Sequence, residues 1–196
     1  MTRNATRTTR WGGDDVEVLE RAWPSARDVV GYRKTYALRP GERWRDAPVT
    51  LDQYEHLVDD NGEVLPVGVI IARELVESGA DWAYCVELWG SGIVLLDVDA
   101  VCAPIHGPVA TLLDELRAAN GGRLGGLPDV IGRSDHRIHF REAKLGRGRD
   151  ALRPNQHAFM QAQRSRFGDL VDAAVVEWQV SEHSRGTTTE ITDPAS

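Results

Sequence analysis

The stretch RIHFREAKL, residues 137–145, constrains the fold more than any other part of the sequence. Its apolar and polar residues alternate, which is typical of a β-strand with side chains on two opposite faces. Ile138 and Phe140 lie on one of these faces. Glu142 and Lys144 continue the same face, so the strand begins as the wall of a core and ends with an acid and an amine.

The residues before this strand have the pattern of the other half of a β-hairpin. If Asp135 and His136 form the turn, cross-strand partners have residue numbers that sum to 271. Asp129 then faces Glu142, and the Cβ atoms of two side chains opposed in this way lie about 4.5–5.5 Å apart. The register therefore predicts two carboxylates at one end of one face, with Lys144 one step beyond them.

Two carboxylates at this separation repel each other and stay ionised only when a cation lies between them or one keeps a proton. Carboxylate oxygens with room for water and phosphate oxygens suit Mg²⁺ or Mn²⁺. Such a metal lowers the pKa of a bound water and neutralises charge on a phosphate that is being displaced. We therefore predict Asp129 and Glu142 as metal ligands. Lys144 is the candidate catalytic residue that orients or deprotonates the water or stabilises the transition state.

The rest of the chain predicts an α/β sandwich in one domain over residues 16–180. Residues 1–15 and 181–196 are polar, lack periodicity and are expected to be a disordered N-terminus and a disordered C-terminal tail. Hydrophobic periodicity and Pro or Gly boundaries give the expected elements. These are helices over 67–78, within 107–122 and over 154–167, and strands over 129–133, 137–145 and 171–180. The segment 81–101 is ambiguous, since it predicts one or two strands but its latter half also suits a helix, and 20–34 and 48–66 each hold at most one short helix.

The formal net charge of −7 conceals a basic segment. Residues 133–166 contain nine Lys or Arg and three acidic residues, so this window carries +6 and the remainder −13. Arg147 and Arg149 lie in the glycine-containing loop GRGRD, and Arg153 lies at the start of the next helix. Guanidinium groups and helix N-termini suit phosphate oxygens, so these arginines are candidate DNA-phosphate contacts. An ordinary solvated turn stays open as the alternative.

The two cysteines, Cys85 and Cys102, form no CxxC pair, which argues against a disulfide framework or a zinc knuckle. No secretory leader is evident, and no apolar run approaches the length of a membrane span. The sequence therefore predicts a cytoplasmic protein with no membrane partner.

Four motifs resemble the VRR-NUC branch of the PD-(D/E)XK nucleases, in the family's order and spacing. They are GLPDVIG, FREAKL, RDALRPNQHAF and VDAAVVEWQV, and together they cover about residues 126–180. The resemblance implies a restriction-endonuclease-like core, in which helices flank a central mixed sheet, and hydrolysis of DNA phosphodiester bonds with Mg²⁺ or Mn²⁺. It also implies Asp129 and Glu142 as metal ligands, Lys144 as the catalytic lysine and Gln156 as the supporting glutamine.

Upstream, the segments ARELVESGADWAYCVELWGSG and HGPVATLLDELRAANGGRLGGLPD are similar to the C-terminal nuclease domain of the Fanconi-associated nucleases. This similarity extends the best-matched core to 67–180 and implies Glu87 as the first motif acid, a third metal ligand. Cys85 and Val86 stand where that family has His-Gly. From the residues alone Glu115, Glu77 and Glu74 stay open for this role, with Glu115 ranked second.

The expected function is a DNA endonuclease or exonuclease, and the family implies repair or processing of branched, flapped or nicked DNA. A non-catalytic DNA-binding or assembly module on the same fold is the main alternative. An RNA- or nucleotide-directed phosphodiesterase is a second alternative, and a homodimer stays open.

Overall fold

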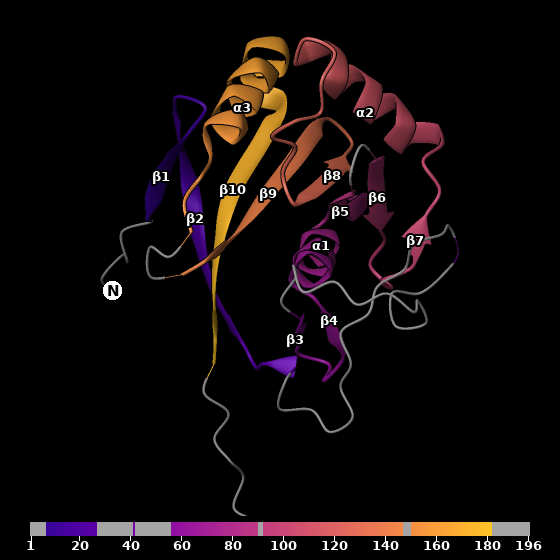
Figure 1. Cartoon of the computed structure of the whole chain (residues 1–196), viewed down its shortest axis with the longest axis vertical. Coiled ribbons are helices and arrows are strands. Elements are labelled where there is room, and N and C mark those ends of the chain that lie inside the picture. Colours follow the sequence, from indigo (N-terminus) through magenta and orange to yellow (C-terminus); the bar gives the residue numbers. More distant parts are fainter. Residues whose placement is uncertain (1–6, 27–40, 42–55, 90–91, 147–149, 182–196) are drawn as a thin grey trace, which may run out of the picture.

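An eight-stranded mixed sheet runs through the part of the chain that the structure describes (Figure 1). The structure is a computed structural model, and it describes residues 7–26, 41, 56–89, 92–146 and 150–181. Along the sheet the strands are β1 (Thr8–Trp11), β2 (Asp14–Trp23), β10 (Val171–Val180), β9 (Arg137–Leu145), β8 (Val130–Ser134), β5 (Trp82–Trp89), β6 (Gly92–Leu96) and β7 (Cys102–Ala103). The long strand β10 pairs in parallel with both β2 and β9, and the other neighbours are antiparallel. A separate two-stranded sheet joins β3 (His56–Val58) to β4 (Val64–Pro66).

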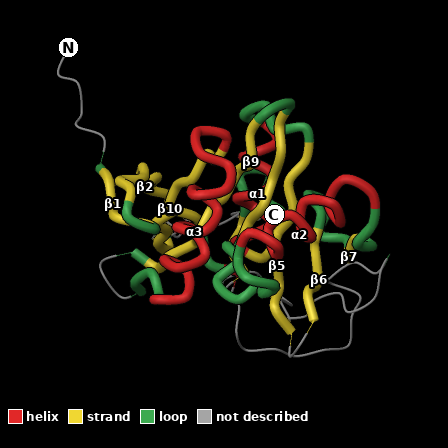
Figure 2. Tube along the Cα trace, turned by 90° about the horizontal axis from the view of Figure 1, so that it is seen from above, coloured by secondary structure: helices red, strands yellow, loops and turns green. Residues whose placement is uncertain are grey.

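Three α-helices in the described residues cover the two faces of the large sheet (Figures 1 and 2). Helix α1 (Val67–Glu77) packs on one face, in a core with residues of β5, β8 and β10. Helices α2 (Gly107–Ala119) and α3 (Pro154–Phe167) pack on the other face, in a core with residues of β8, β9 and β10. The molecule is therefore an α/β fold with a helical layer on each side of a mixed sheet.

The hairpin predicted from the sequence is confirmed. Ile131 pairs with Phe140 and Ser134 with Arg137, so the residue numbers of these partners sum to 271. Residues 135 and 136 form the turn. The alternation in β9 is also as expected, because its buried positions include both Glu142 and Lys144.

The predicted helices and late strands agree with the structure within a residue or two, because clear boundary residues define them. Pro108 and Pro154 occupy first-turn positions in α2 and α3, where the missing N–H costs nothing. Gly79 follows the end of α1 with a φ of 109°, a conformation that residues other than glycine rarely adopt. The ambiguous segment after α1 forms two strands, β5 and β6, which pair antiparallel.

The expected disordered N-terminus was wrong for residues 8–15, which belong to β1, β2 and the turn between them. The reason is tertiary. Trp11 is fully buried, and its Nε1 donates a hydrogen bond to the backbone oxygen of Gln156 at 3.0 Å. Gly12 lies so close to α3 that an added Cβ would be 2.6 Å from the backbone nitrogen of Gln161. Contacts with a helix more than 140 residues away cannot be read from the local pattern.

The short helices expected within 20–34 and 48–66 are not seen where the structure describes these segments. Residues 20–23 are the end of β2, and residues 56–58 and 64–66 form β3 and β4. Ser25 forms an isolated β-bridge with Leu57, and residues 59–63 connect β3 to β4. Residues 27–34 and 48–55, and all of the expected tail except residue 181, lie outside the described residues. None of the described helices is long and apolar enough to cross a membrane.

Gly126 provides a test of how tightly the segment before β8 packs against α3. Its φ is 87°, and an added Cβ would clash with the backbone oxygen of Asn155 and lie 3.0 Å from Phe159 Cβ. We expect Gly126→Ala to lower the free energy of unfolding by about 2 kcal/mol or more, because both the backbone and the neighbouring helix must shift. Chemical denaturation measures this change.

The adjacent Gly125 is a matched control, because an added Cβ there meets no atom within 4 Å. Gly125→Ala should stay within about 0.5 kcal/mol of the wild type. Equal effects of the two substitutions would contradict this packing.

Candidate active site

Asp129 and Glu142 lie side by side, as the hairpin register requires. Asp129 directly precedes β8, and its backbone oxygen accepts a hydrogen bond from the N–H of Val86 on β5 at 2.7 Å. Its Oδ2 accepts a hydrogen bond from the N–H of Ala143 on β9 at 2.8 Å. The first bond holds the Asp129 backbone against β5 and the second holds its carboxyl group against β9, where the Asp129 and Glu142 carboxyls are close enough to affect each other's pKa.

The Glu142 carboxyl group is the most deeply buried part of this arrangement, with a side chain that is only 1% exposed. Its Oε1 accepts hydrogen bonds from Lys144 Nζ at 2.9 Å and from Gln156 Nε2. Its Oε2 has no hydrogen-bond partner among the described residues. A buried carboxylate oxygen without a donor is costly, so this atom is a position where a ligand would be stabilising.

The first turn of α3 fixes the orientation of Gln156. The side-chain Oε1 of Gln156 accepts a hydrogen bond from the N–H of Arg153 at 2.8 Å, which leaves its Nε2 free to donate to Glu142. Arg153 is the N-cap residue of α3, its backbone oxygen accepts a hydrogen bond from the N–H of Gln156 at 3.0 Å, and Pro154 lies in the first turn. The sequence RPNQ therefore both begins the helix and points an amide donor at the buried acid.

Lys144 reaches the site from the same face of β9 as Glu142. Its side chain is 7% exposed, and its Nζ lies 3.5 Å from Asp150 Oδ2 in addition to its contact with Glu142. Asp150 is 39% exposed and precedes α3. The ammonium group therefore lies between a buried carboxylate and one at the surface.

Burial and like charge raise the pKa values of both motif acids. Burial raises the pKa of Glu142 to about 8, and the charge of Asp129 adds to this effect while Lys144 opposes it. Burial also raises the pKa of Asp129, against the Ala143 N–H and the charge of Lys144, which lower it. Without a cation the pair therefore holds a proton near neutral pH.

The two carboxylates suit a cation such as Mg²⁺ or Mn²⁺, which takes few ligands from the protein, better than a metal whose ligands all come from the protein. No group of three or more His, Cys, Asp and Glu side chains in the described residues is arranged to hold a metal ion. Mg²⁺ commonly binds one or two carboxylates and completes its coordination with water and substrate phosphate. The free Oε2 of Glu142 and the adjacent Asp129 carboxyl provide such a pair.

Glu87 lies near Asp129 along the sheet, but its side chain is on the face of the sheet that α1 covers. Its strand neighbour Val86 bonds to the Asp129 backbone, while Cys85 Sγ lies 3.8 Å from Glu87 Oε1. Cys85 belongs to the core under α1, whereas Phe140, two residues before Glu142 on β9, belongs to the core under α2 and α3. Alternation thus places Glu87 and Glu142 on opposite faces of the sheet, and Glu87 as a metal ligand stays a prediction.

The three alternative acids make contacts elsewhere or point to solvent. Glu74 pairs with Arg21 at 2.9 Å. Glu115 lies 4.0 Å from Arg133, which is four residues beyond Asp129 and therefore about 13 Å away along β8. Glu77 is exposed at the end of α1. None of these contacts supports a place for the three acids beside Asp129.

Two of the predicted phosphate contacts, Arg147 and Arg149, lie outside the described residues. The third, Arg153, is exposed at the N-terminus of α3. His139, which follows the opposite alternation to Glu142, bonds to Asp172 at 2.7 Å and to Ser134 at 2.8 Å. It therefore joins three strands on the far face and takes no part in the site.

Sequence reasoning missed two residues that the structure adds to the site. Asp150 contacts Lys144, and Trp11 supports the first turn of α3. An acid in the loop between the ExK strand and the next helix is a signal that could have identified Asp150. Trp11 carries no comparable local signal, since its partner is remote in sequence.

Comparison of the chain with models of protein families, with curated proteins and with solved structures found no match. The resemblance to the VRR-NUC nucleases therefore rests on the motifs quoted above. The geometry of the site is an observation of its own, independent of that resemblance.

The raised pKa of Glu142 predicts how stability depends on pH in the absence of metal. The folded protein keeps a proton up to about pH 8 that the unfolded chain releases near its ordinary glutamate value, so stability falls as pH rises between these values. Glu142→Gln resembles the protonated form and should remove this slope. Between pH 5 and pH 8.5 we expect the free energy of unfolding of the variant, relative to that of the wild type, to increase by about 1–3 kcal/mol.

Urea denaturation in a metal chelator at several pH values measures this difference, with the exposed Glu115→Gln as the control. Parallel pH profiles for the wild type and Glu142→Gln would show that Glu142 does not titrate abnormally.

Proposed function

We propose that this protein is a metal-dependent nuclease that hydrolyses DNA phosphodiester bonds with Mg²⁺ or Mn²⁺, on a PD-(D/E)XK core of the VRR-NUC kind. The observation that carries the proposal is the buried Glu142 carboxylate, which has Asp129 beside it and Lys144 and Gln156 bound to one of its oxygens. The mixed sheet with helices on both faces is consistent with such a core. The order Asp, then Glu-x-Lys, then Gln matches the motif order that suggested the family.

Each residue of the site has a role that follows from its contacts. Asp129 and Glu142 would hold the metal, which would supply an activated water and neutralise charge on the phosphate. The amide of Gln156, whose own orientation is held by the N–H of Arg153, fixes the rotamer of Glu142, so that Oε2 stays available. Lys144 presents a positive charge next to the acid pair, where negative charge increases as a phosphodiester is attacked.

DNA is the proposed substrate because the segment that carries the site also carries the positive charge. Residues 133–166 have a net charge of +6 on an otherwise acidic chain. Arg153 is exposed at the start of α3, the same helix turn that supplies Gln156. The family resemblance suggests branched, flapped or nicked DNA, with a homodimer as an open alternative.

A non-catalytic DNA-binding or assembly module on the same fold is the second candidate. One observation favours it: Glu87 lies on the opposite sheet face from Glu142. Of the three motif acids, only Asp129 and Glu142 therefore lie together. The two candidates differ in whether Mn²⁺ supports cleavage.

The metal site predicts distinct effects of three substitutions. Asp129→Asn and Glu142→Gln should abolish both Mn²⁺ binding and cleavage, because each removes a carboxylate from the pair. Lys144→Ala should keep Mn²⁺ binding but reduce cleavage by about 10²–10³-fold, because it removes electrostatic stabilisation alone. Calorimetry measures binding, and labelled branched, duplex and single-stranded DNA and RNA measure cleavage.

The exposed Asp114→Asn on α2, whose side chain is 74% exposed, is the matched control and should change neither property. Mn²⁺ affinity that is unchanged in Asp129→Asn and Glu142→Gln would remove the metal site. Metal binding and DNA binding without cleavage of any substrate would favour the assembly module, and cleavage of RNA alone would favour an RNA-directed enzyme.

Binding to DNA should weaken steeply with salt, because phosphate contacts release counterions. The triple variant Arg147→Ala, Arg149→Ala, Arg153→Ala should reduce the slope of log affinity against log salt by about 2–3. Fluorescence anisotropy of labelled DNA, with Ca²⁺ in place of Mn²⁺ and at several salt concentrations, measures this slope.

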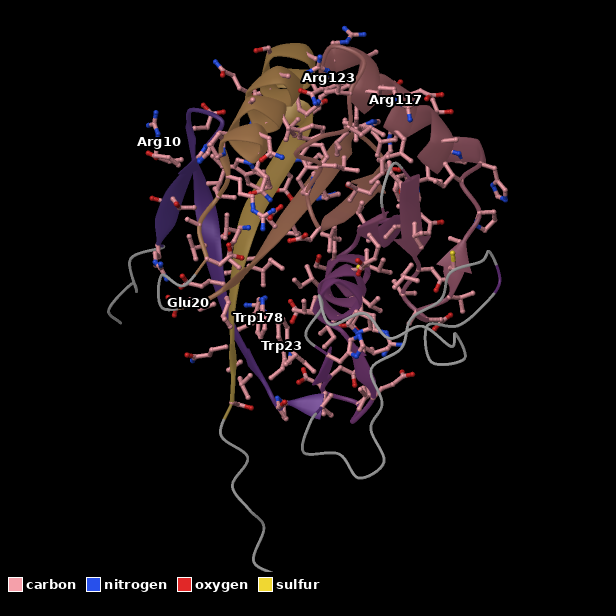
Figure 3. All side chains as sticks on the ribbon, viewed as in Figure 1. Arg10, Glu20, Trp23, Arg117, Arg123 and Trp178 are labelled. Atoms are coloured by element: carbon pink, nitrogen blue, oxygen red, sulfur yellow. The ribbon has the colours of Figure 1, made fainter. Side chains whose placement is uncertain are left out.

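A triple Ala variant at Arg10, Arg117 and Arg123 is the control. Figure 3 shows these side chains toward the upper end of the molecule, whereas Trp178, which pairs with Leu145 at the end of β9, lies lower. An equal loss of slope in both triple variants would mean that binding is not localised at the loop before α3.

A further inference from the structure

The ion pair between Lys144 and Asp150 is the part of the site that the proposed reaction does not yet use. Lys144 Nζ lies 2.9 Å from Glu142 Oε1 and 3.5 Å from Asp150 Oδ2. The pair spans two elements, because Lys144 is on β9 and Asp150 comes just before α3. Asp150 also acts on the site at longer range, since its negative charge contributes to the raised pKa of Asp129.

Glu142 alone is a poor anchor for Lys144 once the site holds a cation. Oε1 of Glu142 already accepts a hydrogen bond from Gln156, and its negative charge would be shared with a metal. A lysine ammonium is a point charge on a flexible four-carbon chain, so it leaves a partner whose charge is neutralised. The second carboxylate, Asp150, has no such competing donor among the described contacts of the site.

We propose that Asp150 is a positioning residue that keeps the ammonium of Lys144 in the site when the acid pair binds its cation. This inference rests on the proposed function, because it assigns Asp150 a role in the same reaction. Asp150 acts through Lys144 rather than as a ligand of the metal. The geometry supports this distinction, since the ammonium lies between Glu142 and Asp150, and no three acids of the described site converge on one point.

A purely structural role for Asp150 is a weaker account of the same contact. Its side chain is 39% exposed, and ion pairs with an exposed partner contribute little to folding stability. Asp150 precedes the N-cap Arg153 by three residues, so it lies before the first turn, where helix-dipole effects are strongest. Asp150→Asn should therefore leave the fold intact.

The test measures the reactivity of the Lys144 amine, which does not depend on nuclease activity. The chain has two lysines, Lys34 and Lys144, so Lys34 is an internal reference for acetylation by acetic anhydride, quantified by mass spectrometry. In saturating Mn²⁺, Asp150→Asn should raise acetylation of Lys144 relative to Lys34 by roughly two- to fivefold, because a partner that holds the ammonium is lost. Asp150→Glu should restore protection, while Asp169→Asn, an exposed acid beyond the other end of α3, should have no effect.

Two further measurements separate this inference from the proposed function. In Asp150→Asn, Mn²⁺ affinity should stay within about twofold of the wild type while kcat for DNA cleavage falls, and Asp150→Glu should recover kcat. Unchanged acetylation of Lys144 in Asp150→Asn would overturn the inference, as would a loss of Mn²⁺ affinity as large as that of Asp129→Asn. If the wild type neither binds Mn²⁺ nor cleaves DNA, the proposed function fails, and acetylation without Mn²⁺ still decides whether Asp150 holds Lys144.

Discussion

The burial of the Glu142 carboxylate is the constraint on which the rest of the site depends. A side chain that is 1% exposed cannot keep a negative charge without compensation, so donors must come to it from other elements. Lys144 arrives from the same strand, and Gln156 arrives from the first turn of α3. The start of α3 is in turn held by Trp11 from the opposite end of the chain and by the close approach of Gly126. The surroundings of one carboxylate are therefore built from segments that are distant in sequence.

One face of the sheet carries the candidate site and the other carries a separate network of ion pairs, because side chains alternate between the two faces along each strand. The face under α2 and α3 carries Phe140, Glu142 and Lys144, so the core wall continues directly into the site. On the other face Asp172 bonds to His139 at 2.7 Å and to Arg141 at 2.8 Å, contacts that lower the pKa of the Asp172 carboxyl. This second network joins β9 to β10 and fixes the strand that presents Glu142. A rigid strand matters for a metal site, because small displacements of ligands weaken binding and catalysis.

The sequence was sufficient where local pattern and tertiary structure agree. The alternation of β9 and the polar turn at 135–136 determined the register, and that register brought Asp129 to Glu142. Prolines and glycines marked the ends of α1, α2 and α3. The prediction was wrong for residues 8–15, because Trp11 is held by a hydrogen bond to α3 and not by residues adjacent to it in sequence. Asp150 was overlooked although it is only six residues from Lys144, because the sequence of the loop indicated phosphate-binding arginines and not an acid that pairs with the lysine. Glu87 illustrates the limit of motif order, because proximity to Asp129 along the backbone does not determine the face on which a side chain lies.

The central claim is that Asp129 and Glu142 together form a metal centre, and a crystal grown with Mn²⁺ tests it most directly. We predict an anomalous difference peak about 2.1 Å from Glu142 Oε2 and from a carboxylate oxygen of Asp129, with Lys144 still close to Asp150. The remaining ligands should be water. A peak on the other face of the sheet beside Glu87, or no peak at the pair under conditions that support cleavage, would contradict the account.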